Sequence, residues 1–285
     1  MALVFGGPEN KFTSPDEAKV VVLPVPYGKT VSYRKGTENG PAAILEASDN
    51  LELFDEELNK EIHLIGINTA PLLKVSNLKS EAMITAVEKS VADILRLDKM
   101  PVVLGGEHAV TIGAVRAAKE KFNDLSILYF DAHSDLRDSY DGNKYSHACV
   151  ARRLLEIAPV VASGIRSLSR EEHEFALNNK GVKIIKMHDM IKNHDWQNTV
   201  KDSLSKNIYI SIDLDVFDPS IMPSVGTPEP GGMHWHGFLE AIRNIISGKN
   251  VVGFDVVELC PIKDMVAPDF MAAKLIYKIL GYIFP

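Results

Sequence analysis

Short apolar runs rich in Val and Ile recur along the chain, and longer segments with helical spacing separate them. Eight of these runs have the length and the β-branched content of buried strands. They span residues 19–25, 63–68, 101–106, 125–131, 159–165, 182–187, 207–213 and 250–256. Because strands that are apolar along most of their length are typical of parallel sheets covered on both faces, the pattern predicts an α/β fold.

Three of the intervening segments predict helices clearly. Residues 40–48 carry Pro41 in the first turn, where a helix does not need the missing N–H. Residues 80–97 repeat an apolar side chain at every fourth position, at Met83, Val87, Val91 and Leu95. The third helix, residues 268–284, lies near the end of the sequence.

The alternation of strands and helices is unbroken by a linker, a repeat or a low-complexity tract. We therefore predict a single domain spanning residues 1–285. Eight strands with intervening helices suit both a TIM barrel and an open three-layer sandwich, so the strand count alone does not decide between them.

Composition narrows the class of protein. The 285 residues are 46% hydrophobic and 24% charged, as in ordinary globular proteins, and the net charge of −7 argues against a nucleic-acid binder. Two cysteines, Cys149 and Cys260, give no disulfide framework, which fits a reducing compartment. With no signal peptide visible and no apolar run near the ~20 residues of a membrane span, we expect a cytoplasmic protein with no membrane partner.

Candidate chemistry gathers where four of the predicted strands end. The polar residues at these ends are His108; Asp131, His133 and Asp135; Asp213 and Asp215; and Glu258. Since functional sites of parallel α/β sheets form at the carboxyl ends of the strands, we expect these side chains to converge.

The spacing of these residues favours a metal site. Positions i and i+2 of an extended segment point the same way, so the aspartates and histidines of each motif can project together. Four aspartates and two histidines repel one another without cations, whereas two divalent ions turn them into a ligand set. A single Asp-x-Asp at a strand end is often only a loop or a cap. Its combination with the other motifs favours metal, and oxygen-dominated ligands with some imidazole suit Mn²⁺.

Three of these motifs resemble the signatures of a known family. The stretches "GGEH", "DAHSD" and "SIDLDVFDP" are similar to those of the ureohydrolases, which include arginases and agmatinases. Supporting stretches are "YRKGTENGPAAILEAS", "GIRS" and "TPEPGG", so the resemblance spans nearly the whole chain. It implies an arginase-like three-layer α/β/α sandwich with an eight-stranded, mostly parallel sheet. It also implies two Mn²⁺ per subunit and a homotrimer or homohexamer.

The resemblance assigns a role to each ligand. Asp131 and Asp213 match the residues that bridge two metals. One site is completed by His108 and Asp135, and the other by His133 and Asp215. Asp218 matches no ligand position, and we interpret it as a turn residue before Pro219.

The chemistry expected of such a site is hydrolysis of a guanidino group to urea and an amine. A guanidinium is a poor electrophile, and two metals supply a hydroxide nucleophile by lowering the pKa of water from about 15.7 towards about 7. We expect Glu258 to bind the guanidinium by paired hydrogen bonds, the alternative being a helix cap or a solvent-facing side chain. His147 lies where the family carries a catalytic, proton-shuttling histidine, although a lone histidine after a loop is more often a surface residue. Asp255 is expected to orient its neighbours.

The substrate prediction depends on departures from arginases. The loop "LRDSYDGNKYSH" has Arg137 and Asp138 where arginase-type recognition of an amino acid needs another pattern, and an arginase carboxylate is replaced around Ser169. This resembles agmatinases and favours agmatine, a small cationic substrate that would give putrescine for polyamine biosynthesis. N1-aminopropylagmatine is the nearest alternative, ahead of arginine, guanidinobutyrate and formiminoglutamate. A metal-binding protein without activity and a deacetylase-type zinc hydrolase also stay open.

Overall fold

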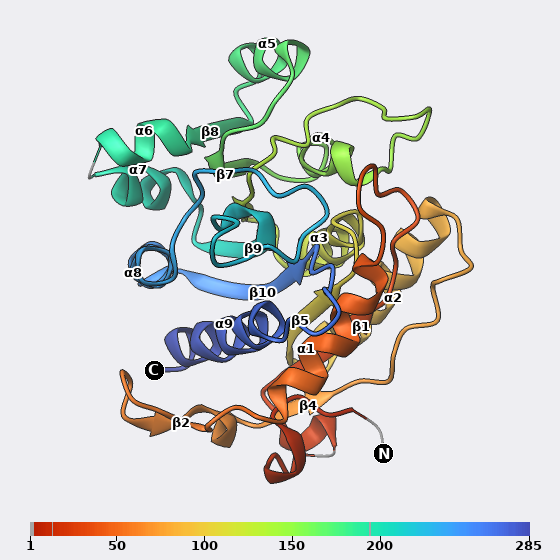
Figure 1. Cartoon of the computed structure of the whole chain (residues 1–285), viewed down its shortest axis with the longest axis vertical. Coiled ribbons are helices and arrows are strands. Elements are labelled where there is room, and N and C mark those ends of the chain that lie inside the picture. Colours follow the sequence, from red (N-terminus) through yellow and green to blue (C-terminus); the bar gives the residue numbers. More distant parts are fainter. Residues whose placement is uncertain (1–2, 13, 194) are drawn as a thin grey trace.

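One eight-stranded sheet runs through the centre of the computed structural model, which describes residues 3–12, 14–193 and 195–285 (Figure 1). All of its paired strands are parallel. In spatial order they are β4 (Ile67–Thr69), β1 (Val20–Val25), β5 (Met100–Gly105), β10 (Asn250–Val257), β9 (Asn207–Asp213), β6 (Leu125–Phe130), β7 (Val160–Ile165) and β8 (Val182–Lys186). Because β4 and β8 are edges that do not pair with each other, the sheet is open and the TIM barrel is excluded.

Helices cover both faces of this sheet. One face carries α1 (Gly40–Ser48), α7 (Trp196–Ser203), α8 (Trp235–Ile246) and α9 (Ala267–Ile283). The other face carries α2 (Ser80–Arg96), α3 (Val110–Lys121) and α4 (Val150–Leu154). Beyond these lie α5 (Arg170–Asn178), α6 (Met187–Lys192) and the short hairpin of β2 (Phe54–Asp55) and β3 (Lys60–Glu61). The predicted three-layer α/β/α sandwich is confirmed.

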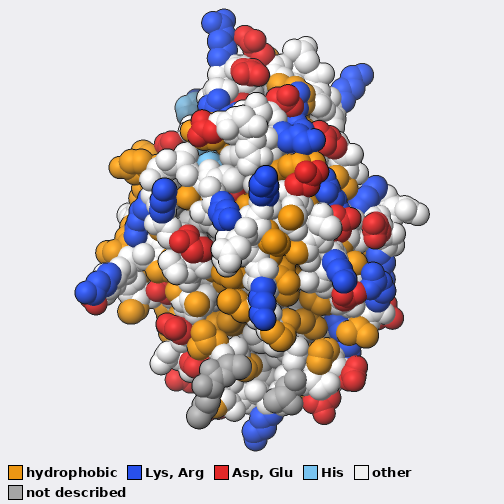
Figure 2. All heavy atoms as spheres, turned by 90° about the vertical axis from the view of Figure 1, so that its right-hand side faces the viewer, with side chains coloured by type: hydrophobic (Ala, Val, Ile, Leu, Met, Phe, Trp, Pro, Cys, Tyr) orange, Lys and Arg blue, Asp and Glu red, His pale blue; other side chains and the backbone are white. Residues whose placement is uncertain are grey.

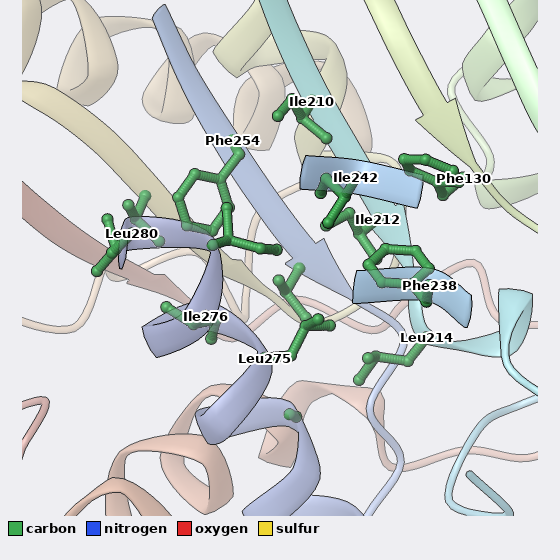
Figure 3. Packing of buried hydrophobic residues seen from close by; sticks show 14 of the residues in the cluster. Phe130, Ile210, Ile212, Leu214, Phe238, Ile242, Phe254, Leu275, Ile276 and Leu280 are labelled. Atoms are coloured by element: carbon green, nitrogen blue, oxygen red, sulfur yellow. The ribbon is translucent and has the colours of Figure 1, made fainter. Parts of the chain in front are cut away.

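The hydrophobic core is split in two by the sheet, as alternation along a strand requires. Val20 and Val22 of β1 belong to the cluster beneath α1, α8 and α9, whereas Val21 and Leu23 belong to the cluster beneath α2 and α3. Figure 3 shows the first cluster, in which Phe254 and Ile212 face side chains of α8 and α9. Each such side chain contributes about 1.5–3 kcal/mol when buried, so both faces hold the strands in place.

The predicted strand over residues 63–68 is only partly right. A 3-10 turn occupies Ile62–Ile65, and β4 begins at Ile67. Between them Gly66 has a φ of 83°, and a Cβ there would lie 2.8 Å from the carbonyl oxygen of Glu17. The chain therefore bends sharply at this glycine, and the apolar run on its two sides is not one strand. The other seven predicted strands match β1 and β5–β10 to within one or two residues.

Charges of both signs are mixed on the face of the molecule seen in Figure 2, where acidic and basic side chains are interspersed among hydrophobic ones. Such a mixture differs from the basic stripe of a nucleic-acid-binding surface. Within the described ranges, no helix is long and apolar enough to cross a membrane. Cys149 and Cys260 are both free and buried.

Candidate binuclear metal centre and active site

The loop after β6 carries three of the predicted ligands to the carboxyl end of the sheet. The His133 N–H donates to Oδ1 of Asp131 over 2.5 Å, which holds these two residues in a tight turn. Asp135 has a φ of 49°, in the left-handed region that Asp adopts more readily than most residues. The spacing predicted an extended segment, and the structure shows instead a chain that turns at Asp135. Its polar side chains still gather on one side.

The second pair of aspartates converges in a similar way. β9 ends at Asp213, and a 3-10 turn follows at Leu214–Val216. Oδ1 of Asp213 accepts the N–H of Asp215 over 2.8 Å, so a turn and not an extended chain brings the two carboxylates together. Asp215 in turn accepts the N–H of Ala132 through Oδ1 at 2.9 Å, which joins this turn to the loop after β6.

Asp218, predicted to lie outside the ligand set, connects the turn after β9 to the loop at Gly231 and Gly232. Its Oδ1 accepts the N–H of Ser220, and its Oδ2 accepts the N–H groups of Gly231 and Gly232 at 2.8 and 3.1 Å. The prediction of a turn residue is confirmed. These hydrogen bonds, Ser220 first, hold the pKa of the carboxyl well below its usual range.

His108 directs one ring nitrogen into this group of carboxylates. Its Nδ1 lies 3.1 Å from Oδ2 of Asp131, 3.1 Å from Oδ2 of Asp213 and 3.5 Å from Oδ2 of Asp135. The ring also stacks on Tyr129, with 4.7 Å between the ring centroids. The Tyr129 hydroxyl donates to Oδ2 of Asp135 over 2.8 Å and so fixes that carboxylate beside the imidazole.

The other nitrogen of His108 is held by the sheet. Nε2 lies 2.9 Å from the hydroxyl oxygen of Ser211, and that hydroxyl donates to Oδ1 of Asp255 over 2.7 Å. Since the Ser211 hydroxyl donates to Asp255, its oxygen is available to accept a proton from Nε2, an arrangement that would leave Nδ1 for a metal. An imidazole oriented in this way is the usual form of a metal ligand. Asp255 thus has the orienting place expected for it.

His133 forms the second half of the cluster. Its Nδ1 lies 2.8 Å from Oδ2 of Asp215 and 3.6 Å from Oδ1 of Asp131. Two groups therefore have ligand atoms within 4.8 Å of one another: His108 with Asp131 and Asp213, and His133 with Asp131 and Asp215. Asp131 belongs to both groups, which is the place of a bridging ligand. Asp135 is outside both but next to the first.

The charges of this cluster call for cations. Burial raises the pKa of Asp213, and the neighbouring Asp215 and Asp131 raise it further. Burial and Asp131 also raise the pKa of Asp135 to about 8. Burial alone would lower the pKa of His133, but Asp215 and Asp131 outweigh it and raise the pKa. Among the described residues, the buried Oδ2 of Asp131 accepts no hydrogen bond. A carboxylate oxygen without a hydrogen-bond donor, among groups whose pKa shifts favour positive charge nearby, fits a divalent metal. These residues therefore suit the two Mn²⁺ ions that the family resemblance implies.

Glu258 lies beside the ligands, immediately after β10. Its N–H donates to the carbonyl oxygen of Gly106, and its Oε1 accepts the N–H of His108, both over 2.8 Å. The side chain is 8% exposed and caps no helix. Burial is the main cause that raises its pKa to about 8. Held on the same backbone segment as His108, this carboxylate is a fixed acceptor for a cationic group.

His147 begins the 3-10 turn His147–Cys149 and lines the same cavity as the predicted ligands. Its Nδ1 is 3.1 Å from the hydroxyl oxygen of Ser146, and its N–H donates to Oγ1 of Thr30 over 3.0 Å. Burial lowers the pKa of its imidazole to about 4. The ring is therefore neutral near pH 7 and able to accept a proton.

A cavity of about 170 Å³ joins these groups. Five of the six predicted ligands line it together with Glu258 and His147, the ligands being His108, His133, Asp135, Asp213 and Asp215. Arg34, Arg137, Tyr140 and Thr227 contribute to the rest of its wall. All the predicted site residues except Asp131 thus line one small cavity.

Sequence reasoning missed residues that hold this cavity in shape. Arg166, in the "GIRS" stretch, donates from its guanidinium to the carbonyl oxygens of Asp215 at 2.7 Å and Glu229 at 2.8 Å. It thereby ties the ligand turn after β9 to the "TPEPGG" loop. The only signal for it was that "GIRS" supported the resemblance, which gave no role to the arginine. Sequence reasoning also missed Glu172, which accepts hydrogen bonds from the loop after β6, and the hydrogen-bonded pair Glu107 and Thr30.

Comparison with known proteins agrees with this arrangement. The model of the arginase family matches residues 18–281. The chain belongs to the arginase family. It is 42% identical to an N(1)-aminopropylagmatine ureohydrolase of Synechocystis sp. over 278 residues, 95% of this chain and 90% of the relative. It is 35% identical to an agmatinase of Pyrococcus horikoshii, with 93% and 92% of the two chains covered.

The fold is shared with a solved relative. The crystal structure of the agmatine ureohydrolase of Thermoplasma volcanium superposes with a TM-score of 0.89 at 36% identity, covering 98% of this chain and 94% of that one. The recognition of a ureohydrolase, an enzyme of this family with an arginase-like fold, is therefore confirmed. The individual roles assigned to the ligands, to Glu258 and to His147 stay predictions.

Proposed function

We propose that this chain is a binuclear-metal ureohydrolase that cleaves the guanidino group of an agmatine-type substrate to urea and an amine. The observation that carries the proposal is the cluster of six predicted ligands around Asp131, opening into one cavity with Glu258 and His147. We propose two Mn²⁺ ions there, held by His108, Asp131, His133, Asp135, Asp213 and Asp215. When bound, such ions lower the pKa of water and provide the nucleophile at neutral pH.

The residues of the chain supply binding and proton transfer. The Glu258 carboxylate accepts N–H groups of the guanidinium and holds its carbon over the metal-ligand cluster. The neutral His147 ring first accepts a proton from water and then donates it to the departing amine nitrogen. The overall reaction balances: a guanidinium and one water molecule give urea and a protonated amine.

Two substrates differ only in the group beyond the guanidino end. Agmatine was favoured by the loop that contains Arg137 and Asp138, and a P. horikoshii relative is named agmatinase. The Synechocystis relative, at higher identity, is named for N(1)-aminopropylagmatine. We therefore propose agmatine and N1-aminopropylagmatine as the two substrates to compare, the second being favoured by identity.

The test is urea release from agmatine, N1-aminopropylagmatine, arginine and guanidinobutyrate in the presence of Mn²⁺. We expect one of the first two to have the highest kcat/KM and metal analysis to find about two Mn²⁺ per chain. Asp131→Ala should lose metal and urea release together. A wild-type protein with two metals bound that releases urea from none of the four compounds would contradict the proposal, and one tight Zn²⁺ would favour a deacetylase-type hydrolase.

We also propose that the enzyme acts in the cytoplasm, in polyamine biosynthesis, as a homotrimer or homohexamer. The two free, buried cysteines support a reducing compartment, and the family resemblance supports the assembly. Light scattering of the purified protein measures the assembly directly.

A further inference from the structure

The carboxylate between the Gly-Gly pair and the ligand His108 has no place in the chemistry described so far. Glu107 is fully buried, and no basic side chain among the described residues lies within ion-pair distance of it. A buried carboxylate without a cation is costly unless its oxygens are hydrogen-bonded, so the partners of Glu107 show what it does.

Both oxygens of Glu107 are used by one residue of the loop after β1. Oε2 accepts the N–H of Thr30 and Oε1 accepts its hydroxyl, each over 2.6 Å. The hydroxyl proton is committed to Glu107, so Oγ1 of Thr30 is free to accept. It accepts the N–H of His147 over 3.0 Å and lies 3.4 Å from Nδ1 of the same residue. Hydrogen bonds thus join Thr30 to Glu107, 77 positions along the chain, and to His147, 117 positions along the chain.

The backbone at Gly106 and Glu107, where this series of hydrogen bonds begins, is held tightly against Tyr27. The N–H of Glu107 donates to the carbonyl oxygen of Tyr27 over 2.7 Å, and a Cβ on Gly106 would lie only 2.1 Å from that oxygen. Gly106 also accepts the N–H of Glu258 through its carbonyl oxygen. The segment Gly106–His108 consequently carries a metal ligand, supports Glu258 and anchors the loop at Thr30, all from one piece of backbone.

We propose that Glu107, which follows β5 next to His108, and Thr30, in the loop after β1, are a positioning pair for His147 in the hydrolysis. Neither residue lines the cavity that holds the predicted ligands. The pair fixes the backbone and the ring of His147 relative to the metal ligands, and this inference rests on the catalytic role proposed for His147. Since misplacing a catalytic group by about 1 Å costs roughly 100-fold in rate, loosening the pair should lower kcat more than it raises KM.

The experiment combines single and double variants of the Mn²⁺-loaded enzyme. Thr30→Val keeps the shape but removes the hydroxyl, and we expect kcat to fall about 10- to 100-fold with KM within about threefold of wild type. Thr30→Ser keeps the hydroxyl and should retain most of the activity. In a His147→Ala background, Thr30→Val should change kcat by less than about twofold, because the group that it positions is already gone.

A second variant, in the other residue of the pair, keeps the proposal testable if Thr30→Val fails to fold. Glu107→Gln replaces one acceptor of the pair and should show the same dependence on His147, with two Mn²⁺ still bound by metal analysis. Equal losses in the wild-type and His147→Ala backgrounds, or an unchanged kcat in both Thr30→Val and Glu107→Gln, would overturn the positioning role. Absence of urea release by the wild-type enzyme would instead contradict the proposed function, so the two failures are distinguishable.

Discussion

Glu172 on α5 offers a test of how the ligand loop is supported from outside the metal centre. Its side chain is 5% exposed. Oε1 accepts the hydroxyl of Ser134 and the N–H of Leu136 at 2.8 and 3.0 Å, and these two residues flank the ligand Asp135. Oε2 accepts the N–H of Ser169, which completes a capping box at the start of α5. One carboxylate therefore joins a helix terminus to the loop that carries three ligands.

The expected loss follows from these bonds. Removing a capping side chain costs about 1 kcal/mol, and hydrogen bonds to a charged group contribute about 1.5–3 kcal/mol. Because the three bonds share one carboxylate and are not additive, we expect Glu172→Ala to lower the free energy of unfolding by about 3 kcal/mol. In a chain of this size that is a fall in Tm of roughly 6 °C. Glu172→Gln keeps one acceptor oxygen and should lose about half as much.

The pH dependence has a definite sign. Burial alone would raise the pKa of Glu172, but hydrogen bonds from Ser169, Ser134 and Leu136 outweigh it and hold the pKa below its ordinary value. A depressed folded-state pKa adds stability above the pKa of the unfolded chain, about 4.3, and the gain is lost as pH falls through the folded-state pKa. The difference between wild type and Glu172→Gln should therefore be full at pH 7 and shrink below about pH 4.

The assay is thermal unfolding in the presence of a chelator, followed by Mn²⁺ titration of each variant. Chelation removes the stabilisation by bound metal, so the change in Tm reports the support of the loop itself. We also expect the apparent Mn²⁺ affinity to fall about 10- to 100-fold, as for other groups that orient ligands. Glu171→Ala, at an exposed neighbouring position, is the matched control. A Glu172→Ala protein that unfolds with the control and binds Mn²⁺ like wild type would refute the reasoning.

Two further substitutions test other parts of the structure. Glu258→Gln should lower kcat/KM at least 100-fold while two metals stay bound, because it removes the negative charge proposed to bind the guanidinium. Metal analysis beside urea release checks this, and a tenfold loss or less would contradict the binding role. Lys278→Met should cost about 3–5 kcal/mol in chemical denaturation, since it leaves the buried carboxylate of Asp55, 3.1 Å from Nζ, without its cation. Lys274→Met, on the same helix but half-exposed, should cost less than about 0.5 kcal/mol.

Local pattern was sufficient for seven strands of the main sheet and insufficient for β4 and several helices. Continuous apolar runs identified β1 and β5–β10 because both faces of the sheet are covered. The same burial hides α3, where nearly every residue from Val110 to Ala118 is buried and no polar stripe marks the helical period. Gly113 adds to this, since it breaks a helical pattern while allowing α3 to approach α2, where a Cβ would lie 2.4 Å from the carbonyl oxygen of Ile84.

The candidate site divides in the same way. The predicted metal ligands lie in short motifs at strand ends, so spacing and resemblance together point to them. Arg166 and Thr30 act through contacts with residues 49 and 77 or more positions away. Such pairs have no local signature, because their partners meet only when the sheet has assembled. Sequence reasoning therefore found the residues that gather in the candidate site and missed those that hold them in place.

The backbone at Glu258 argues for its role without reference to any relative. Its φ of 67° lies in the left-handed region, which costs a residue with a Cβ roughly 1–2 kcal/mol. A helix cap or a solvent-facing glutamate has no need of that conformation, and Gly or Asn would adopt it more easily. The hydrogen bonds to Gly106 and from His108 hold the strained residue with its carboxylate buried in the cavity. Strain at a residue whose charge is expensive to bury, beside the predicted ligand cluster, supports the binding role proposed for Glu258.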